Sequence, residues 1–519
     1  MTANNQSSQR TTGENMNRRQ FIQKSLIGLT LLPQAGNAMG TLLGGVGQDD
    51  FIHPVFPKVD FYLPDLEQGQ PLNGKQRFTL TLQQGKTKIL PDVTTQTIGI
   101  NQDFLGPVIR IKKGQKLRME VTNQLNEVAA LHWHGMILPA TEDGGPHQPI
   151  SPGKTWIAEW DVINEPSTLF YHSHTHQHTG SQVWRGLGGQ MQVVDEERDA
   201  ELGLPHEYGM DDFPVILMDR AFDETGEFIY SNERMNKMQG MHGDTMLVNG
   251  RANSVLRPQK DRIRLRLHNA SNARFYDLVF SDKRSFQVIA GDGGLLETPQ
   301  TLNRLRLSPA ERAEILVDLS DHQPVSLKTL AGYGNLSMGM GGMMRDTSKL
   351  DQDYDLFHID PRKSEATKPS MIERLIPLPD WSNVEIAQTR TMNLEMQMGP
   401  RMMFGSGGFT INGQAMQMEV INERLTANSF EIWHLKNPSM MHHPFHIHNT
   451  QFKVLDRNGQ APYPWEQGLK DTVTVHRDET VRILLPTGPY YNNQEPYMYH
   501  CHILEHEDAG MMGQFIVTT

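Results

Sequence analysis

One strand–turn–strand pattern recurs three times along the chain, and this recurrence limits the fold more than any other feature. Alternating segments occur at 116–123, 261–270 and 430–437, and Val248-Asn249-Gly250 and Ile411-Asn412-Gly413 precede the last two. Alternation of apolar and polar residues predicts a half-buried strand, and Asn-Gly predicts a turn. We therefore expect an all-β fold of three tandem Greek-key β-sandwiches. The expected boundaries are 51–200, 205–350 and 391–519, with a linker at 351–390.

Composition agrees with this architecture and narrows the class of partner. A length of 519 residues suits roughly three domains. The 45 glycines and 30 prolines are typical of a turn-rich β protein. The net charge of -12 argues against a nucleic-acid partner, because the phosphate backbone attracts basic surfaces.

The N-terminus has the pattern of an export signal. Arg18-Arg19-Gln20-Phe21 matches a twin-arginine motif, and the short apolar run 25–32 precedes small residues near 36–38. The alternative, a membrane anchor, needs a run of about 20 apolar residues to span the bilayer. We expect residues 1–40 to be a signal peptide read by the twin-arginine export machinery. The mature protein is then a periplasmic monomer without membrane insertion, and Met16 is an alternative start to Met1.

The single cysteine of the chain, Cys501, lies in His500-Cys501-His502 and is followed by His506 and Met511. A thiolate with imidazoles and a thioether is the ligand set of a blue-copper site. Residues two apart on a strand share a face, so His500 and His502 are expected on the face opposite Cys501. There they could hold a second metal site.

Three more His-X-His pairs lie upstream. One such pair is more often an ordinary polar contact than a metal site. Four pairs, two in the first repeat and two in the third, instead predict a metal cluster where those two domains meet. His443 would join Cys501, His506 and Met511 in a mononuclear site within the third domain. The three upstream pairs are His132/His134, His172/His174 and His446/His448.

These motifs, taken in order, resemble the multicopper oxidase family over essentially the whole chain after the signal. The likeness is nearest to the bacterial periplasmic copper efflux oxidases. It implies cupredoxin-like domains and four copper ions as cofactors. The implied ligands are His443, Cys501, His506 and Met511 for type 1 copper, with Met512 as the competitor of Met511; His132 and His446 for type 2; and His134, His172, His174, His448, His500 and His502 for the type 3 pair.

The resemblance also implies a reaction. Single electrons enter at the type 1 site, pass from Cys501 through the backbone to His500 and His502, and reduce O2 to water at the cluster. Glu507 and Asp143 match family positions for acidic residues that serve the cluster with protons; otherwise they are ordinary surface or turn carboxylates. The remaining histidines near the motifs are expected outside the ligand set: His176, His178 and His442.

The motifs do not fix which substrate donates the electrons. Thioethers select Cu(I), and a glycine-rich segment unsuited to a core strand carries Met338, Met340, Met343 and Met344. Met441 stands two residues before His443, where the copper efflux oxidases carry a methionine for substrate copper. Two departures weaken this likeness: Ser439 replaces an aspartate of those enzymes, and the methionine-rich stretch near 390–408 is short.

Three functions follow, in order of preference. The first is oxidation of Cu(I) in periplasmic copper detoxification, with additional substrate copper bound at the methionines. The second is a laccase that oxidises small phenolic reductants. The third is a non-catalytic copper-binding or cell-envelope protein. Copper-free relatives of that kind are expected to have lost ligands, and none is missing here.

Overall fold

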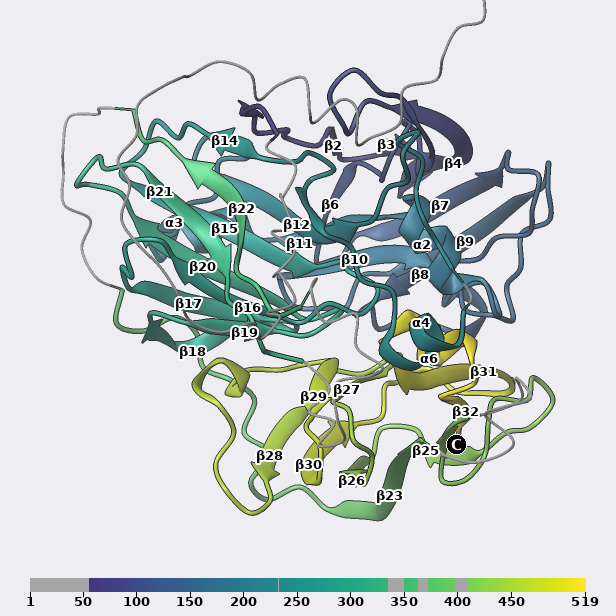
Figure 1. The fold of residues 1–519 in the computed structure, drawn as a ribbon. Helices are drawn as coiled ribbons and strands as arrows, with labels where there is room; N and C mark the ends of the chain where they lie inside the picture. The colour runs from purple at the N-terminus through teal and green to yellow at the C-terminus, as the bar shows by residue number, and fades with distance from the viewer. Residues whose placement is uncertain (1–55, 232, 335–349, 363–371, 397–407) are drawn as a thin grey trace, which may run out of the picture. The chain divides into compact units, whose positions relative to one another are not determined.

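The computed structural model describes residues 56–231, 233–334, 350–362, 372–396 and 408–519 (Figure 1). Strands dominate these residues, which confirms the expected all-β fold. The expected signal peptide lies outside them. No described helix is both long and apolar enough to cross a membrane. The helical pieces are short: η1 (Ala140–Glu142), α2 (Thr179–Arg185), α3 (Glu196–Glu201), α4 (Arg234–Gln239), η2 (Pro464–Glu466) and α6 (Leu504–Asp508).

A first group of strands forms two sheets, ordered β2-β6-β11-β10-β8 and β3-β4-β7-β9, with β5 beside β4. The hydrophobic core between them contains Trp133, Trp160 and Tyr171. The strands are β2 (Leu66–Glu67), β3 (Gln70–Leu72), β4 (Lys75–Thr87), β5 (Thr95–Ile100), β6 (Val108–Lys112), β7 (Lys116–Asn123), β8 (Leu131–His134), β9 (Thr155–Asp161), β10 (Ser167–Ser173) and β11 (Gly188–Val194).

A second group also forms two sheets, ordered β13-β12-β15-β20-β17-β18 and β1-β14-β22-β21-β16-β19. The early strand β1 thus joins a sheet made mainly of later strands. The strands are β1 (Val59–Asp60), β12 (Asp212–Arg220), β13 (Thr245–Val248), β14 (Ser254–Leu256), β15 (Arg262–Asn269), β16 (Tyr276–Phe280), β17 (Phe286–Gly291), β18 (Gly294–Leu302), β19 (Leu305–Leu307), β20 (Arg312–Asp318), β21 (Val325–Thr329) and β22 (Tyr354–Ile359).

The third group, green to yellow in Figure 1, has sheets ordered β24-β23-β26-β30-β28 and β25-β32-β31-β27-β29. Its core includes Cys501 and Met511 among apolar residues. The strands are β23 (Ile386–Met396), β24 (Phe409–Ile411), β25 (Glu423–Thr426), β26 (Phe430–Asn437), β27 (His443–Ile447), β28 (Lys453–Arg457), β29 (Thr472–Val475), β30 (Glu479–Pro486), β31 (Asn492–Cys501) and β32 (Met512–Thr518).

The repeated segments form the elements that the pattern predicts. The alternating stretches are strands β7, β15 and β26. Asn249-Gly250 and Asn412-Gly413 have positive φ at both residues, as tight hairpin turns of the Asn-Gly type require. The expected linker 351–390 needs correction at both ends. Strand β22 pairs there with β14 and β21, because its apolar residues complete the core of the second group, and β23 begins at Ile386.

Candidate metal centre

The side chain of Cys501 lies with two imidazoles at the ends of β27 and β31. Its Sγ is 3.4 Å from Nδ1 of His443 and 3.6 Å from Nδ1 of His506, and all three side chains are buried. The far nitrogens of both rings are held: Nε2 of His443 lies 2.8 Å from Oγ of Ser439, and Nε2 of His506 donates to the carbonyl oxygen of Met238. These contacts turn both Nδ1 atoms toward the sulfur.

The structure separates the two methionines that follow this group. The main-chain N–H of Cys501 donates to the carbonyl oxygen of Met511, and both side chains belong to one buried apolar cluster. Met512 instead pairs with His500 across β31 and β32. Directly paired residues of an antiparallel sheet project to the same face, so Met512 lies on the face opposite Cys501. Met511 is therefore the better axial candidate.

The four His-X-His pairs gather from two strands of the first group and two of the third. In the β8–β10 pairing His132 is opposite His172, and in the β27–β31 pairing His446 is opposite His500. Rings from the two groups also stack: His132 on His448 with centroids 3.8 Å apart, and His134 on His446 at 3.6 Å. The strand registers thus align the pairs within each group, and ring stacking joins the groups.

The ring nitrogens of these histidines converge in three sets, within each of which one nitrogen per ring lies within 4.8 Å of the others. Two sets are triplets of the kind that the expected type 3 pair requires. The remaining set contains both expected type 2 ligands. The sets are His134, His172 and His502; His174, His448 and His500; and His132, His446 and His448.

The outward nitrogens of the cluster meet carboxylates that the sequence had singled out. Oδ2 of Asp143 lies 2.7 Å from Nδ1 of His448, and the Asp143 carbonyl lies 2.8 Å from Nδ1 of His132. The carboxylate of Glu507 lies 3.3 Å from Nδ1 of His174 and 3.1 Å from Nδ1 of His500. Neither acid is a surface or turn carboxylate, since both are buried against the cluster.

The sequence analysis did not predict a third carboxylate at the cluster, that of Asp471. Its Oδ1 lies 3.1 Å from Nε2 of His134, and its carbonyl lies 2.9 Å from Nδ1 of His446. Arg312 of the second group holds the carboxylate through both of its terminal nitrogens. Nothing in the local sequence distinguishes Asp471 from a surface acid, because its role depends on long-range contacts with His134 and Arg312.

The protonation of the cluster fits metal binding. Burial lowers the pKa of His172 to about 4 and that of His506 to about 3, so both are neutral near pH 7, the form in which imidazole binds a metal. Burial also raises the pKa of the Cys501 thiol, so a metal would bind with release of its proton.

Unpaired nitrogens supply a second test of the fit. Several buried ring nitrogens facing the cluster have no hydrogen-bond partner among the residues that the structure describes: Nε2 of His132, His172 and His446, and Nδ1 of His134. A buried polar atom without a partner costs free energy, which a bound cation offsets. Imidazoles at the cluster and a thiol with imidazoles at the Cys501 group are donor sets that suit copper.

The remaining predicted residues lie at the edge of the centre or beyond the described part of the chain. Met441 is buried in the apolar cluster that contains Cys501, and Met440 is exposed. His176 and His442 are half-buried and His178 is exposed; none belongs to a set of converging nitrogens among the described residues. Four of the predicted substrate ligands fall outside the described residues: Met338, Met340, Met343 and Met344.

Comparisons with known proteins agree with this geometry. Domain models described as multicopper oxidase match residues 81–198, 221–326 and 384–519. Multicopper oxidase mco of Staphylococcus haemolyticus is 34% identical over 89% of this chain and 92% of its own length. Cell division protein FtsP of Escherichia coli is 32% identical over 97% of this chain and 99% of its own.

A solved structure shows the same fold. It is a bacterial laccase-like multicopper oxidase, CueO of Ochrobactrum sp., described as active towards lignin model compounds and lignosulfonate. It is 32% identical, with a TM-score of 0.78 over 88% of this chain and 100% of that one. The chain therefore belongs to the multicopper oxidase family, the cupredoxin-like copper oxidoreductases that use oxygen as acceptor.

Proposed function

We propose that this oxidase oxidises Cu(I) to Cu(II) and reduces O2 to two waters, with four copper ions held as the sequence analysis assigns them. The observation that carries the proposal is the split environment of one tripeptide. Cys501 contacts His443 and His506, while its neighbours His500 and His502 enter the histidine cluster. One strand end therefore links a soft mononuclear site to a site with ligands for three ions.

Bound copper would supply one-electron redox chemistry at both sites. The protein supplies the connection between them. His500 and Cys501 are adjacent in the chain, and Nδ1 of His500 donates to the carbonyl oxygen of Cys501 at 3.1 Å. This hydrogen bond adds a second link to the covalent one. The remaining connection runs through His502, whose main-chain N–H is fixed by the Pro444 carbonyl.

Asp143 and Glu507 are placed to serve the cluster with protons. Each contacts two of its histidines: Asp143 lies against His448 and His132, and Glu507 lies against His174 and His500. Burial raises the pKa of Asp143 to about 6, although His132 and His500 act in the opposite direction. Within the described ranges its Oδ1 has no hydrogen-bond partner, and Nδ1 of His132 lies 3.5 Å away. We therefore assign Oδ1 of Asp143 as an atom that holds a proton in mildly acidic solution.

Support for Cu(I) as the substrate comes from Met441, a soft ligand buried two residues before His443. Position 439 favours the alternative, oxidation of phenols. Its serine hydroxyl is bonded to His443 and to Asn437, so it offers no carboxylate for a substrate cation. The laccase-like enzyme described above as active on lignin model compounds supports the same alternative.

The cellular setting belongs to the same proposal. We assign three domains at 51–200, 205–350 and 391–519, with the second extended by β22 and the third by the start of β23; three hydrophobic cores support this division. Twin-arginine export to the periplasm rests on the arginine pair at Arg18-Arg19. The name of the FtsP relatives suggests a role in cell division instead; the complete set of expected copper ligands in this chain favours the oxidase.

Steady-state oxygen consumption separates the two substrates. We expect faster turnover with Cu(I) than with a bulky phenol, and phenol turnover that increases when Cu(II) is added. Met441→Leu should reduce Cu(I) turnover selectively, with Met440→Leu as the matched control. High phenol turnover without added copper, combined with poor Cu(I) turnover, would reject the Cu(I) assignment. A colourless, copper-free purified protein that stays colourless after copper loading would reject the oxidase.

A further inference from the structure

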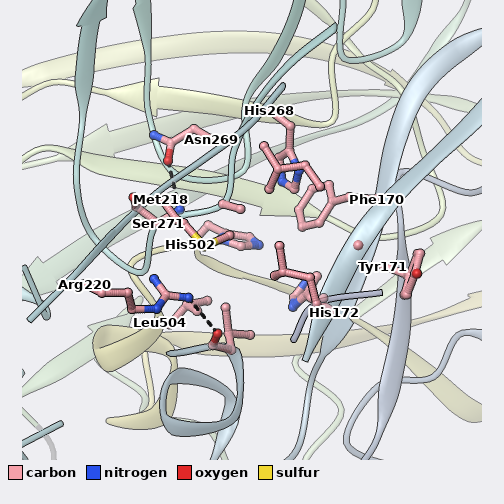
Figure 2. Close-up of a pocket in the computed structure, with 16 residues that line it drawn as sticks. Phe170, Tyr171, His172, Met218, Arg220, His268, Asn269, Ser271, His502 and Leu504 are labelled. Atoms are coloured by element: carbon pink, nitrogen blue, oxygen red, sulfur yellow. Dashed lines mark hydrogen bonds between the residues drawn. The ribbon is translucent and has the colours of Figure 1, made fainter. Parts of the chain in front are cut away.

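A small cavity lies beside the histidine cluster, where the first and second groups of strands meet the segment that follows β31. It is lined by apolar side chains that include Phe170, Ile216, Met218 and Leu504, and by the rings of His268 and His502. Figure 2 shows both rings beside this space, with Phe170 next to His268. The cavity measures about 20 Å³, and one water needs roughly 10–15 Å³ on the same measure. It therefore has room for a single water.

His502 differs from the other seven histidines of the cluster. Each of those seven has a protein oxygen within 3.3 Å of the nitrogen that faces away from the cluster centre. The oxygens come from Asp143, Ser173, Glu507, Asp471 and Cys501. In the described part of the chain, neither ring nitrogen of His502 has a hydrogen-bond partner. One of them converges with His134 and His172, and the other finds no hydrogen-bonding atom on another described residue.

His268, on the other side of the cavity lining, also lacks hydrogen-bond partners among the described residues. It lies on β15 opposite Arg312, is buried, and has no partner for either ring nitrogen among the described residues. It shares a face of β15 with Arg264 and Arg266, both of which are fully paired to carboxylates. Its ring packs against Phe170 with centroids 4.1 Å apart. A polar side chain at the end of a paired row is thus left facing the cavity.

We propose that this cavity binds one water molecule, and that the water bridges His268 to the outward nitrogen of His502. Histidines that bind metals nearly always donate their second N–H to an oxygen, which fixes the tautomer and the ring orientation. The bridge supplies that oxygen to His502 and relieves His268 of one unpaired nitrogen. Leaving both groups buried without a hydrogen-bond partner would be unfavourable, because neither nitrogen would regain the hydrogen bond it loses on leaving solvent.

His268 is then a positioning residue that acts on the cluster through water. Its assignment rests on the proposed role of His502 as a metal ligand, but the water itself does not require metal. A hydrogen bond to the outward nitrogen of a metal-binding histidine typically contributes a factor of 10–100 in metal affinity. Because His268 acts indirectly, we expect its loss to weaken copper binding at the cluster by about tenfold.

Crystal structures of the metal-free protein test the proposal directly. In the unmodified chain we expect a solvent peak within hydrogen-bonding distance of both rings. The peak should disappear in His268→Leu and persist in His268→Gln, which keeps a polar terminus. Ile216→Val is the matched control, since it changes the same cavity without removing a polar group and should keep the water. Copper titration should show the tenfold loss in His268→Leu alone.

Two results would contradict the proposal of a bridging water. One is an empty cavity in the unmodified chain, in crystals whose other buried waters are visible. The other is a peak that stays in place in His268→Leu. A bridging water in a chain that binds no copper would leave the water site intact and reject the proposed function instead, so the two failures are distinguishable.

Discussion

The first group of strands meets its two neighbours through opposite kinds of interface. Towards the second group it meets an ion-pair seam: Arg110 of the first group pairs with Asp212, which also holds Arg266, and within the second group Arg264 and Arg266 share Glu314, which accepts from Thr168 of the first. Every charge of the seam has an opposite charge within reach. Towards the third group it presents the histidine cluster, whose imidazoles are kept neutral by burial and leave nitrogens without hydrogen-bond partners among the described residues.

The difference separates structure from function. A buried charge paired on all sides is satisfied by the protein alone, and removing one partner is costly. A cluster of buried, unpaired nitrogens is a local violation of polar satisfaction, and such violations concentrate at functional sites. We therefore expect the ion-pair seam to hold the fold without metal, and the histidine cluster to depend on copper.

The largest effect is expected from a substitution that breaks the ion-pair seam. Glu314→Gln leaves Arg264 and Arg266 buried with one carboxylate fewer, which should lower the free energy of unfolding by about 3–5 kcal/mol. Urea unfolding of the metal-free protein measures this. Glu165→Gln is the control, because its carboxylate pairs with Lys113 at the surface and should change stability by less than about 1 kcal/mol. Equal effects of both substitutions would contradict the comparison.

The stability difference between the unmodified chain and Glu314→Gln should also depend on pH. Burial raises the pKa of Glu314, but Arg264 and Arg266 outweigh it and hold the value at about 2, below its usual 4.5. A carboxyl group with a lowered folded-state pKa stabilises the protein above its unfolded value and loses that contribution as pH falls. The stability gap between the unmodified chain and Glu314→Gln should be constant above about pH 4.5 and shrink towards pH 2. A gap that shrinks near neutral pH would contradict this.

The second largest effect is expected from a substitution at Asp471, whose carboxylate contacts both Arg312 of the second group and His134 of the cluster. Asp471→Asn weakens the hold of Arg312 and the contact with His134. We expect copper affinity at the cluster to fall by about 10–100-fold, while the absorption of the Cys501 group stays unchanged. Copper titration followed by spectroscopy measures both. Asp456→Asn is a matched control, since Asp456 pairs with Arg482 across β28 and β30 and belongs to none of the converging ligand sets among the described residues. Unaltered copper binding in Asp471→Asn would show that Asp471 has no part in the centre.

The smallest effect concerns the Cys501 group, which lies within the third group alone. Ser439→Ala removes the hydroxyl beside Nε2 of His443 and should cost about 1–3 kcal/mol of stability. Copper content should not change, because no expected ligand is lost. The exposed Ser382→Ala serves as control. Loss of the copper bound by Cys501 in Ser439→Ala would make the serine more than a positioning contact.

Sequence reasoning reached the strands and the histidines because both depend on local spacing. Alternation identified β7, β15 and β26, and the His-X-His spacing placed two rings on one face. It missed Asp471, His268 and Arg312, whose roles come from residues far apart in sequence. The linker was misplaced at β22 because this strand is short, and its place between β14 and β21 depends on pairings with segments far away in the sequence.

The central claim is that Cys501 joins a one-copper site to a three-copper cluster, and copper content tests it most directly. We predict four copper ions per chain and an intense blue absorption in the unmodified protein. Cys501→Ser should retain three coppers and lose both the colour and the turnover. Fewer than four coppers in the fully loaded protein, or colour or turnover that survives in Cys501→Ser, would contradict the account.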